Sequence, residues 1–173
     1  MSECCSGPST SEPGGAFELI DHHGRAVTDR SYRGQFMLLF FGFTHCRAVC
    51  PAALSRLSRA IDRLGPLTSR LQPLYVTVDP ERDTPEVMKA FLRLYPAFTG
   101  LTGSRANIDH VKASYKVFAK RADDPDDPTG YQMPHTAFAY LIGPDGRYVA
   151  HFADAAEEDE LTERIATHLR SGL

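Results

Sequence analysis

The segment Phe36-Met37-Leu38-Leu39-Phe40-Phe41 is apolar without interruption. It is too short for a helix of ordinary length, and as a strand it has no polar face to turn toward water. A strand of this kind is typical of the middle of a sheet that is covered on both faces, as in α/β proteins. The segment therefore predicts a central strand with helices on both sides of its sheet.

Strand and helix patterns alternate along the rest of the chain. Short strands are predicted at Phe17–Ile20 and Leu74–Val78, and a hairpin at 136–142 and 147–152 around Gly143-Pro144-Asp145-Gly146. Apolar residues recur at helical spacing in four segments: Leu54–Leu64, Met88–Tyr95, Ile108–Phe118 and Leu161–Leu169. Ser104 and Thr84 can each cap the helix that follows. This order predicts an α/β sandwich around a mixed sheet.

Length and composition fit one soluble domain. The chain has 173 residues, of which 42% are hydrophobic and 24% charged, enough to build a core without disulfides. Residues 1–14 are rich in Ser, Pro, Gly and Glu and are predicted to be a disordered tail, so 15–173 form the domain. The net charge of −3 argues against binding to nucleic acid or to anionic membranes. No apolar run reaches the ~18 residues of a membrane span, and no signal peptide is visible at the start.

Cys46 and Cys50 follow the predicted central strand, at the expected start of a helix. The helix dipole and the free N–H groups there favour the thiolate, and Pro51 costs little in a first turn. Residues four apart share one helix face, so the sulfurs can converge. Such a pair suits a soft ion, Cu(I) or Zn(II), and also allows a disulfide. Cys4 and Cys5, in the predicted tail, are interpreted as incidental.

Two sulfurs leave a metal site incomplete, and His135 is one candidate for a third ligand. It stands in Met133-Pro134-His135-Thr136, just before a predicted strand. If that strand returns to the middle of the sheet, His135 reaches the end at which the cysteines lie. Spacing alone favours ordinary polar surface for a single loop histidine. His45 adjoins Cys46, but its side chain is expected to point away from the ligands.

These motifs together resemble the Sco/SenC family. The resemblance rests on Phe41-Gly42-Phe43-Thr44-His45-Cys46-x-x-x-Cys50-Pro51, on Asp79-Pro80-Glu81-Arg82-Asp83-Thr84-Pro85, and on His135 before the final hairpin. It implies a thioredoxin-like fold with an N-terminal β extension. It also implies copper binding by Cys46, Cys50 and His135, in the maturation of the copper centre of cytochrome c oxidase.

The resemblance further implies partners and a location. The partner would be the oxidase subunit that carries the copper centre, or another copper chaperone, and the chain is expected to be a monomer. Family members typically face the periplasm or the mitochondrial intermembrane space from a membrane anchor. We therefore expect a periplasmic or membrane-anchored location, although no anchor is visible in this chain.

The chain departs from the family pattern at two places. Arg47 and Ala48 replace the usual Pro-Asp, and Pro134 replaces the usual Asp. A cationic Arg47 favours the thiolate and suits a reductase. A thiol–disulfide oxidoreductase with Cys46 and Cys50 as its redox pair is therefore the alternative prediction. A peroxidase is disfavoured, because no Pro-x-x-x-Thr-x-x-Cys arrangement is present.

The segment Asp79–Pro85 allows two interpretations on its residues alone. Asp79 follows a predicted strand, and Arg82 can pair with Asp79 or with Asp83. The segment is then either a rigid strand-to-helix turn or part of the functional site.

Overall fold

The computed structural model describes residues 12–45, 49–119, 122–123, 131–132, 138–153 and 156–171. Side chains are described for 12–45, 51–119, 138–153 and 156–171. Residues 1–11 of the predicted tail lie outside the described residues. Gly14, at the other end of that tail, donates its N–H to the carbonyl of Ser114 at 2.9 Å. No helix within the described ranges is long and apolar enough to cross a membrane.

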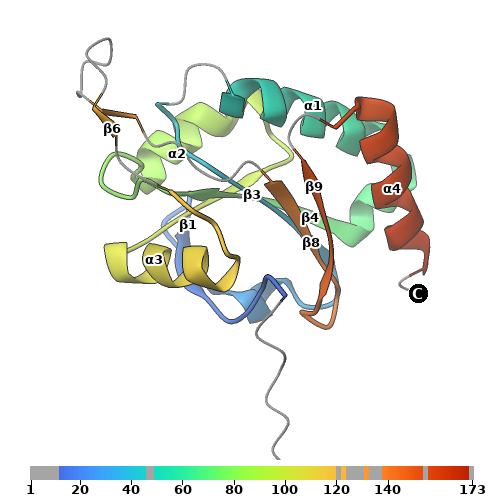
Figure 1. The fold of residues 1–173 in the computed structure, drawn as a ribbon, viewed down its shortest axis with the longest axis horizontal. Helices are drawn as coiled ribbons and strands as arrows, with labels where there is room; N and C mark the ends of the chain where they lie inside the picture. The colour runs from blue at the N-terminus through green and yellow to red at the C-terminus, as the bar shows by residue number, and fades with distance from the viewer. Residues whose placement is uncertain are drawn as a thin grey trace, which may run out of the picture.

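The described residues form a seven-stranded mixed sheet in the order β2-β1-β5-β4-β3-β8-β9 (Figure 1). Its strands are β1 Glu18–Asp21, β2 Ala26–Thr28, β3 Phe36–Gly42, β4 Leu71–Thr77, β5 Thr99–Thr102, β8 Phe138–Ile142 and β9 Tyr148–Ala153. β6 (Ala122–Asp123) and β7 (Tyr131–Gln132) pair separately. The helices are α1 Val49–Arg63, α2 Pro85–Phe91, α3 Arg105–Ser114 and α4 Glu158–Ser171, with the 3-10 helices η1 Asp29–Tyr32, η2 Gly65–Arg70 and η3 Leu92–Leu94.

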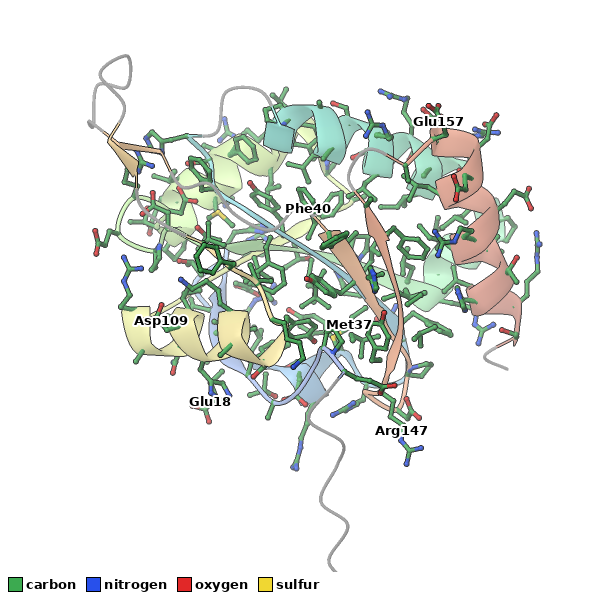
Figure 2. All side chains as sticks on the ribbon, in the orientation of Figure 1. Glu18, Met37, Phe40, Asp109, Arg147 and Glu157 are labelled. Carbon is green, nitrogen blue, oxygen red and sulfur yellow. The ribbon has the colours of Figure 1, made fainter. Side chains whose placement is uncertain are left out.

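The predicted central strand is confirmed. β3 is buried along its whole length and lies between β4, which is parallel to it, and β8, which is antiparallel. Phe36, Leu38 and Phe40 pack on one side of the sheet, in a core that α1, α2 and α4 close. Met37, Leu39 and Phe41 pack on the other side, beneath α3 and the β1–β2 hairpin. Figure 2 shows Phe40 toward α1 and Met37 toward α3.

Most of the predicted elements form, with shifts at their ends. The N-terminal hairpin pairs β1 with β2, and the final hairpin pairs β8 with β9. Ser104 caps α3 by accepting a hydrogen bond from the Asn107 N–H at 3.1 Å. Thr84 caps α2 in the same way, from the Val87 N–H at 3.3 Å. The α/β prediction is therefore confirmed in its architecture.

Several features differ from the sequence prediction, among them β2, β6 and β7, which were not predicted. β5 was not predicted, because Thr-Gly-Leu-Thr is short and only one of its residues is strongly apolar; it pairs in parallel with β4 and carries β1 on its other edge. The predicted helix through Phe118 is wrong at its end, because α3 stops at Ser114. Lys116 then takes a left-handed backbone with a φ of 56°, and Phe118 lies 72% exposed instead of joining the stripe.

The sheet topology brings three strand ends together. Because β3, β4 and β5 are parallel, their carboxyl ends lie at the same edge of the sheet. β8 runs antiparallel to β3, with Ala139 opposite Phe40, so the amino end of β8 begins at this edge as well. In α/β sheets such an edge is the usual place for a functional site.

Candidate functional site

The cysteine pair lies where β3 gives way to α1. β3 ends at Gly42, and Phe43, Thr44 and His45 lead to Cys46. α1 begins at Val49, between the two cysteines, so the predicted helix start is confirmed. Cys50 has helical backbone in the first turn of α1, where the dipole and the free N–H groups favour a thiolate. Cys46 and the side chain of Cys50 lie outside the described residues, as do Arg47 and Ala48.

His135 and Pro134 also lie outside the described residues. The described frame on either side of His135 is β7, which ends at Gln132, and β8, which begins at Phe138. The amino end of β8 is paired next to the carboxyl end of β3. The chain therefore enters the sheet at the edge where the cysteines follow β3.

Asp83 is the centre of a buried hydrogen-bond network at this edge. Its side chain is 0% exposed. Its Oδ2 accepts from the Thr44 N–H at 3.0 Å and from the Thr77 hydroxyl at 2.7 Å. Its Oδ1 accepts from the Thr44 hydroxyl at 2.6 Å. The backbone carbonyl of Asp83 accepts from the Thr102 hydroxyl at 2.7 Å. One residue thus joins the chain at the ends of β3, β4 and β5.

Burial raises the pKa of Asp83, although the hydrogen bonds from Thr44 and Thr77 oppose the shift; the nearby Asp79 carboxylate also raises it. Burial dominates because a carboxylate is poorly solvated in the interior, and a second negative charge adds repulsion. His45 Nδ1 lies 3.9 Å from Asp83 Oδ1 and 3.2 Å from the Thr44 hydroxyl. The ring of His45 therefore contacts the network through the Thr44 hydroxyl.

Arg82 pairs with Asp79, one of the two partners that the sequence allowed. The Asp79 side chain is 1% exposed and that of Arg82 9%, so this is a buried ion pair. The Arg82 guanidinium also lies 5.7 Å from the ring centroid of Phe43. The Asp79–Pro85 segment is thus a braced turn, and it holds the chain that leads to Cys46.

Sequence reasoning missed the shared role of Thr44, Thr77 and Asp83. A usable signal existed, because Thr77 is the last residue but one of the predicted strand Leu74–Val78, Thr44 and Asp83 come a few residues after predicted strands, and polar residues at the ends of parallel strands meet at one edge. Within the described side chains, no group of three or more His, Cys, Asp and Glu residues could hold a metal ion. The predicted ligands Cys46, Cys50 and His135 were not among the side chains searched, because theirs lie outside the described residues.

A mixed sheet covered on both faces, with Cys50 in the first turn of the helix that follows the central strand, defines a protein of the thioredoxin-like fold. The sequence model described as SCO1/SenC matches residues 6–170. The chain belongs to the SCO1/SenC family. The predicted fold and family are therefore confirmed.

Relatives and solved structures agree with this assignment. The human "Protein SCO1 homolog, mitochondrial" is 39% identical over 160 residues, which cover 91% of this chain and 53% of the human protein. The chain thus spans about half the length of that relative. The copper-bound structure of Bradyrhizobium japonicum ScoI is 40% identical with a TM-score of 0.82, and the match covers 93% of this chain and 99% of that one.

A third similar structure is that of BsSco, a member of the Sco family of cytochrome c oxidase assembly proteins in which a disulfide switch was identified. It is 26% identical with a TM-score of 0.74, and the match covers 93% of each chain.

Proposed function

We propose that this chain binds copper and serves as an assembly factor for the copper centre of cytochrome c oxidase. Its family membership and its likeness to a copper-bound Sco structure support this function. The observation that carries the proposal is the start of α1 at Val49, between Cys46 and Cys50, at the carboxyl end of the central strand. A helix start is where two thiolates are most easily formed and held.

In this proposal copper is the cargo, and Cys46, Cys50 and His135 are its ligands. Two thiolates suit Cu(I), and an imidazole adds affinity for Cu(II). Coordination by two sulfurs and one nitrogen leaves an open side through which ligands of a partner can take the ion. Because cysteine binds the metal only as a thiolate, oxidation of the pair to a disulfide removes two of the three ligands and should release the copper. The redox state of the cysteines would therefore control loading.

The partner in this proposal is the oxidase subunit that carries the copper centre, or another copper chaperone that supplies the ion. The chain would act as a monomer in the periplasm, at the membrane surface where the oxidase is assembled. The described edge suits a transfer protein, because three strand ends and the amino end of β8 converge there.

Copper titration of the reduced protein tests this function. We expect one equivalent of Cu(II) to give sulfur-to-copper charge-transfer absorption, which Cys46→Ser should abolish. His135→Ala should weaken Cu(II) binding, while His110→Ala is the matched control on α3, since His110 is exposed there. Equal Cu(II) affinity in the two histidine variants would remove His135 from the site. Absence of any charge-transfer absorption would contradict the copper function.

A thiol–disulfide oxidoreductase is the second candidate, with Cys46 and Cys50 as the redox pair. Arg47 beside Cys46 favours it, since a cation stabilises the attacking thiolate. One cysteine would attack a partner's disulfide and the other would resolve the mixed disulfide. Insulin reduction in the presence of dithiothreitol distinguishes the two functions. Turnover that Cys46→Ser abolishes supports the enzyme, and a rate equal to that of dithiothreitol alone argues against it.

A further inference from the structure

Both carboxylate oxygens of Asp83 accept hydrogen bonds from Thr44. Oδ2 accepts the Thr44 backbone N–H and Oδ1 accepts the Thr44 hydroxyl, at 3.0 and 2.6 Å. These two bonds fix the peptide plane and the side-chain rotamer of Thr44 together. Thr44 is separated from Cys46 by His45 alone, so its orientation sets the direction in which the chain leaves β3 toward the first cysteine.

The other partners of Asp83 lie in the interior of the sheet. Thr77 and Thr102 lie on β4 and β5, are 0% and 3% exposed, and hydrogen-bond to the carboxylate and the backbone carbonyl of Asp83. Neither strand is at the edge of the sheet, because the order is β1-β5-β4-β3. The carboxylate is therefore held by the interior of the sheet, and Thr44 is held by the carboxylate.

Stabilising a turn with the buried carboxylate of Asp83 is energetically unfavourable compared with using a neutral side chain. Burial raises the pKa of its carboxyl, so the ionised form is less stable in the folded protein than in water. Arg82, the adjacent cation, pairs with Asp79. A neutral side chain could close the same turn without this cost. The geometry accounts for a carboxylate, since it offers two oxygens to three donors.

We propose that Asp83 is a positioning residue for the Cys46–Cys50 pair, acting through Thr44. The proposal rests on the proposed function of that pair. In this proposal Asp83 does not bind copper; it fixes the backbone and side chain of Thr44, from which the chain continues to Cys46. Groups that orient metal ligands without touching the metal typically change affinity by about 10- to 100-fold when they are removed. Breaking the grip should weaken Cu(I) binding by that factor.

The test breaks one hydrogen bond from both of its ends. Thr44→Val removes the hydroxyl that Oδ1 accepts and keeps the N–H. Asp83→Asn can keep one oxygen for the Thr44 N–H and the Thr77 hydroxyl, but it puts an amide NH2 where Oδ1 accepts the Thr44 hydroxyl; the bond to a charged oxygen is lost, and a weaker bond of reversed direction can at most replace it. Each variant should lose about tenfold or more in Cu(I) affinity, measured by competition with a chromophoric chelator. The double variant should lose no more than one single variant, and Thr44→Ser should bind normally.

Asp29→Asn is the matched control. Asp29 is also buried, at 8% exposure, and accepts hydrogen bonds from the Phe17 N–H and the Arg33 side chain. It precedes the amino end of β3, away from the cysteines. Asp29→Asn should lower the urea midpoint yet leave Cu(I) affinity unchanged. Normal affinity in both Thr44→Val and Asp83→Asn, or an equal loss in Asp29→Asn, would overturn the positioning role.

A second readout separates this proposal from the copper function. The equilibrium of the Cys46–Cys50 pair with oxidised glutathione forms one disulfide and two reduced glutathione molecules, and it needs no metal. Thr44→Val should change its equilibrium constant by about tenfold, because the approach to Cys46 also sets the distance between the sulfurs. If the unsubstituted chain binds no copper, the proposed function fails and this constant decides on Asp83: a shift supports the positioning role, and an unchanged value refutes it.

Discussion

The Thr77 hydroxyl serves two buried partners, and its removal makes a demanding test of the network. It donates to Asp83 Oδ2 at 2.7 Å and accepts from the Asp79 N–H at 2.9 Å. Thr77 is 0% exposed at the end of β4. Thr77→Val keeps the branched shape and the strand preference, so the change removes these two hydrogen bonds and little else.

The loss can be bounded from the two bonds. A hydrogen bond to a charged group contributes about 1.5–3 kcal/mol, and a buried N–H left without a partner costs about 1–3 kcal/mol. The added methyl group of valine returns roughly 1 kcal/mol of apolar burial. We therefore expect Thr77→Val to lower the free energy of unfolding by about 3 kcal/mol. In a domain of this size that corresponds to a fall in Tm of about 6–12 °C.

Urea unfolding followed by circular dichroism measures the change, with Thr162→Val as the control. Thr162 is also buried, at 9% exposure, but its hydroxyl donates to the Glu158 carbonyl one turn earlier in α4. Such a bond adds little to a helix, so the control should stay within about 0.5 kcal/mol of the unsubstituted chain. If the free energy of unfolding of Thr77→Val lies within about 1 kcal/mol of that of the control, the hydrogen bonds of Thr77 do not stabilise this edge of the sheet.

Three other outcomes are expected. Gly146→Ala should destabilise the chain by more than about 1 kcal/mol, because Gly146 has a φ of +84° and an added Cβ would collide with the Arg33 guanidinium. In a double-mutant cycle, Arg33→Ala should restore only the part of the free energy that the collision costs, and the part that comes from the positive φ should remain. Burial raises the pKa of Tyr32 and of Tyr140 to about 12, and it also raises that of Tyr115. Since the unfolded value is near 10.0, the stabilisation they provide is complete below that pH and is lost as the pH rises toward 12. Tyrosinate absorbance from these residues should therefore appear together with the loss of circular dichroism, and its appearance in a still-folded chain would contradict their burial. Free copper at 100 times its dissociation constant should add about 2.7 kcal/mol to the free energy of unfolding, and a chelator should reverse the gain.

Local sequence patterns predicted the elements whose burial can be read directly from the order of apolar residues along the chain. β3 is apolar on both faces because both faces are covered, and α4 buries Leu161, Ile165 and Leu169 at the expected spacing. β5 was not predicted, because its formation depends on pairing with β4 on one edge and with β1 on the other. The helix predicted through Phe118 was too long, because Phe118 fits the helical spacing although the backbone turns at Lys116.

The residues of the site also differ in how far the sequence alone predicts them. Cys46 and Cys50 were predicted from residue type and spacing, since the chemistry of sulfur is visible in the sequence, whereas the assignment of His135 as a ligand came from the family resemblance. Their mutual positions remain a prediction. The hydrogen-bond network around Asp83 was missed as one unit, because its polar groups come from Thr44, Thr77, Asp83 and Thr102, which lie apart in the sequence and which the parallel sheet brings together.

Substitutions at different positions of the family motif should affect folding and copper binding differently. Within Phe43–Pro51, Thr44 is bound through its side chain to the sheet, whereas Cys46 and Cys50 are the proposed ligands. Arg47 and Ala48 lie between those ligands, beyond the residue that Asp83 grips. Changes at 47 and 48 therefore alter the charge around the thiolates without breaking the grip on Thr44. The departure from the usual Pro-Asp should accordingly affect thiolate reactivity and copper preference more than folding, and the free energy of unfolding of Arg47→Pro/Ala48→Asp should be close to that of the unsubstituted chain.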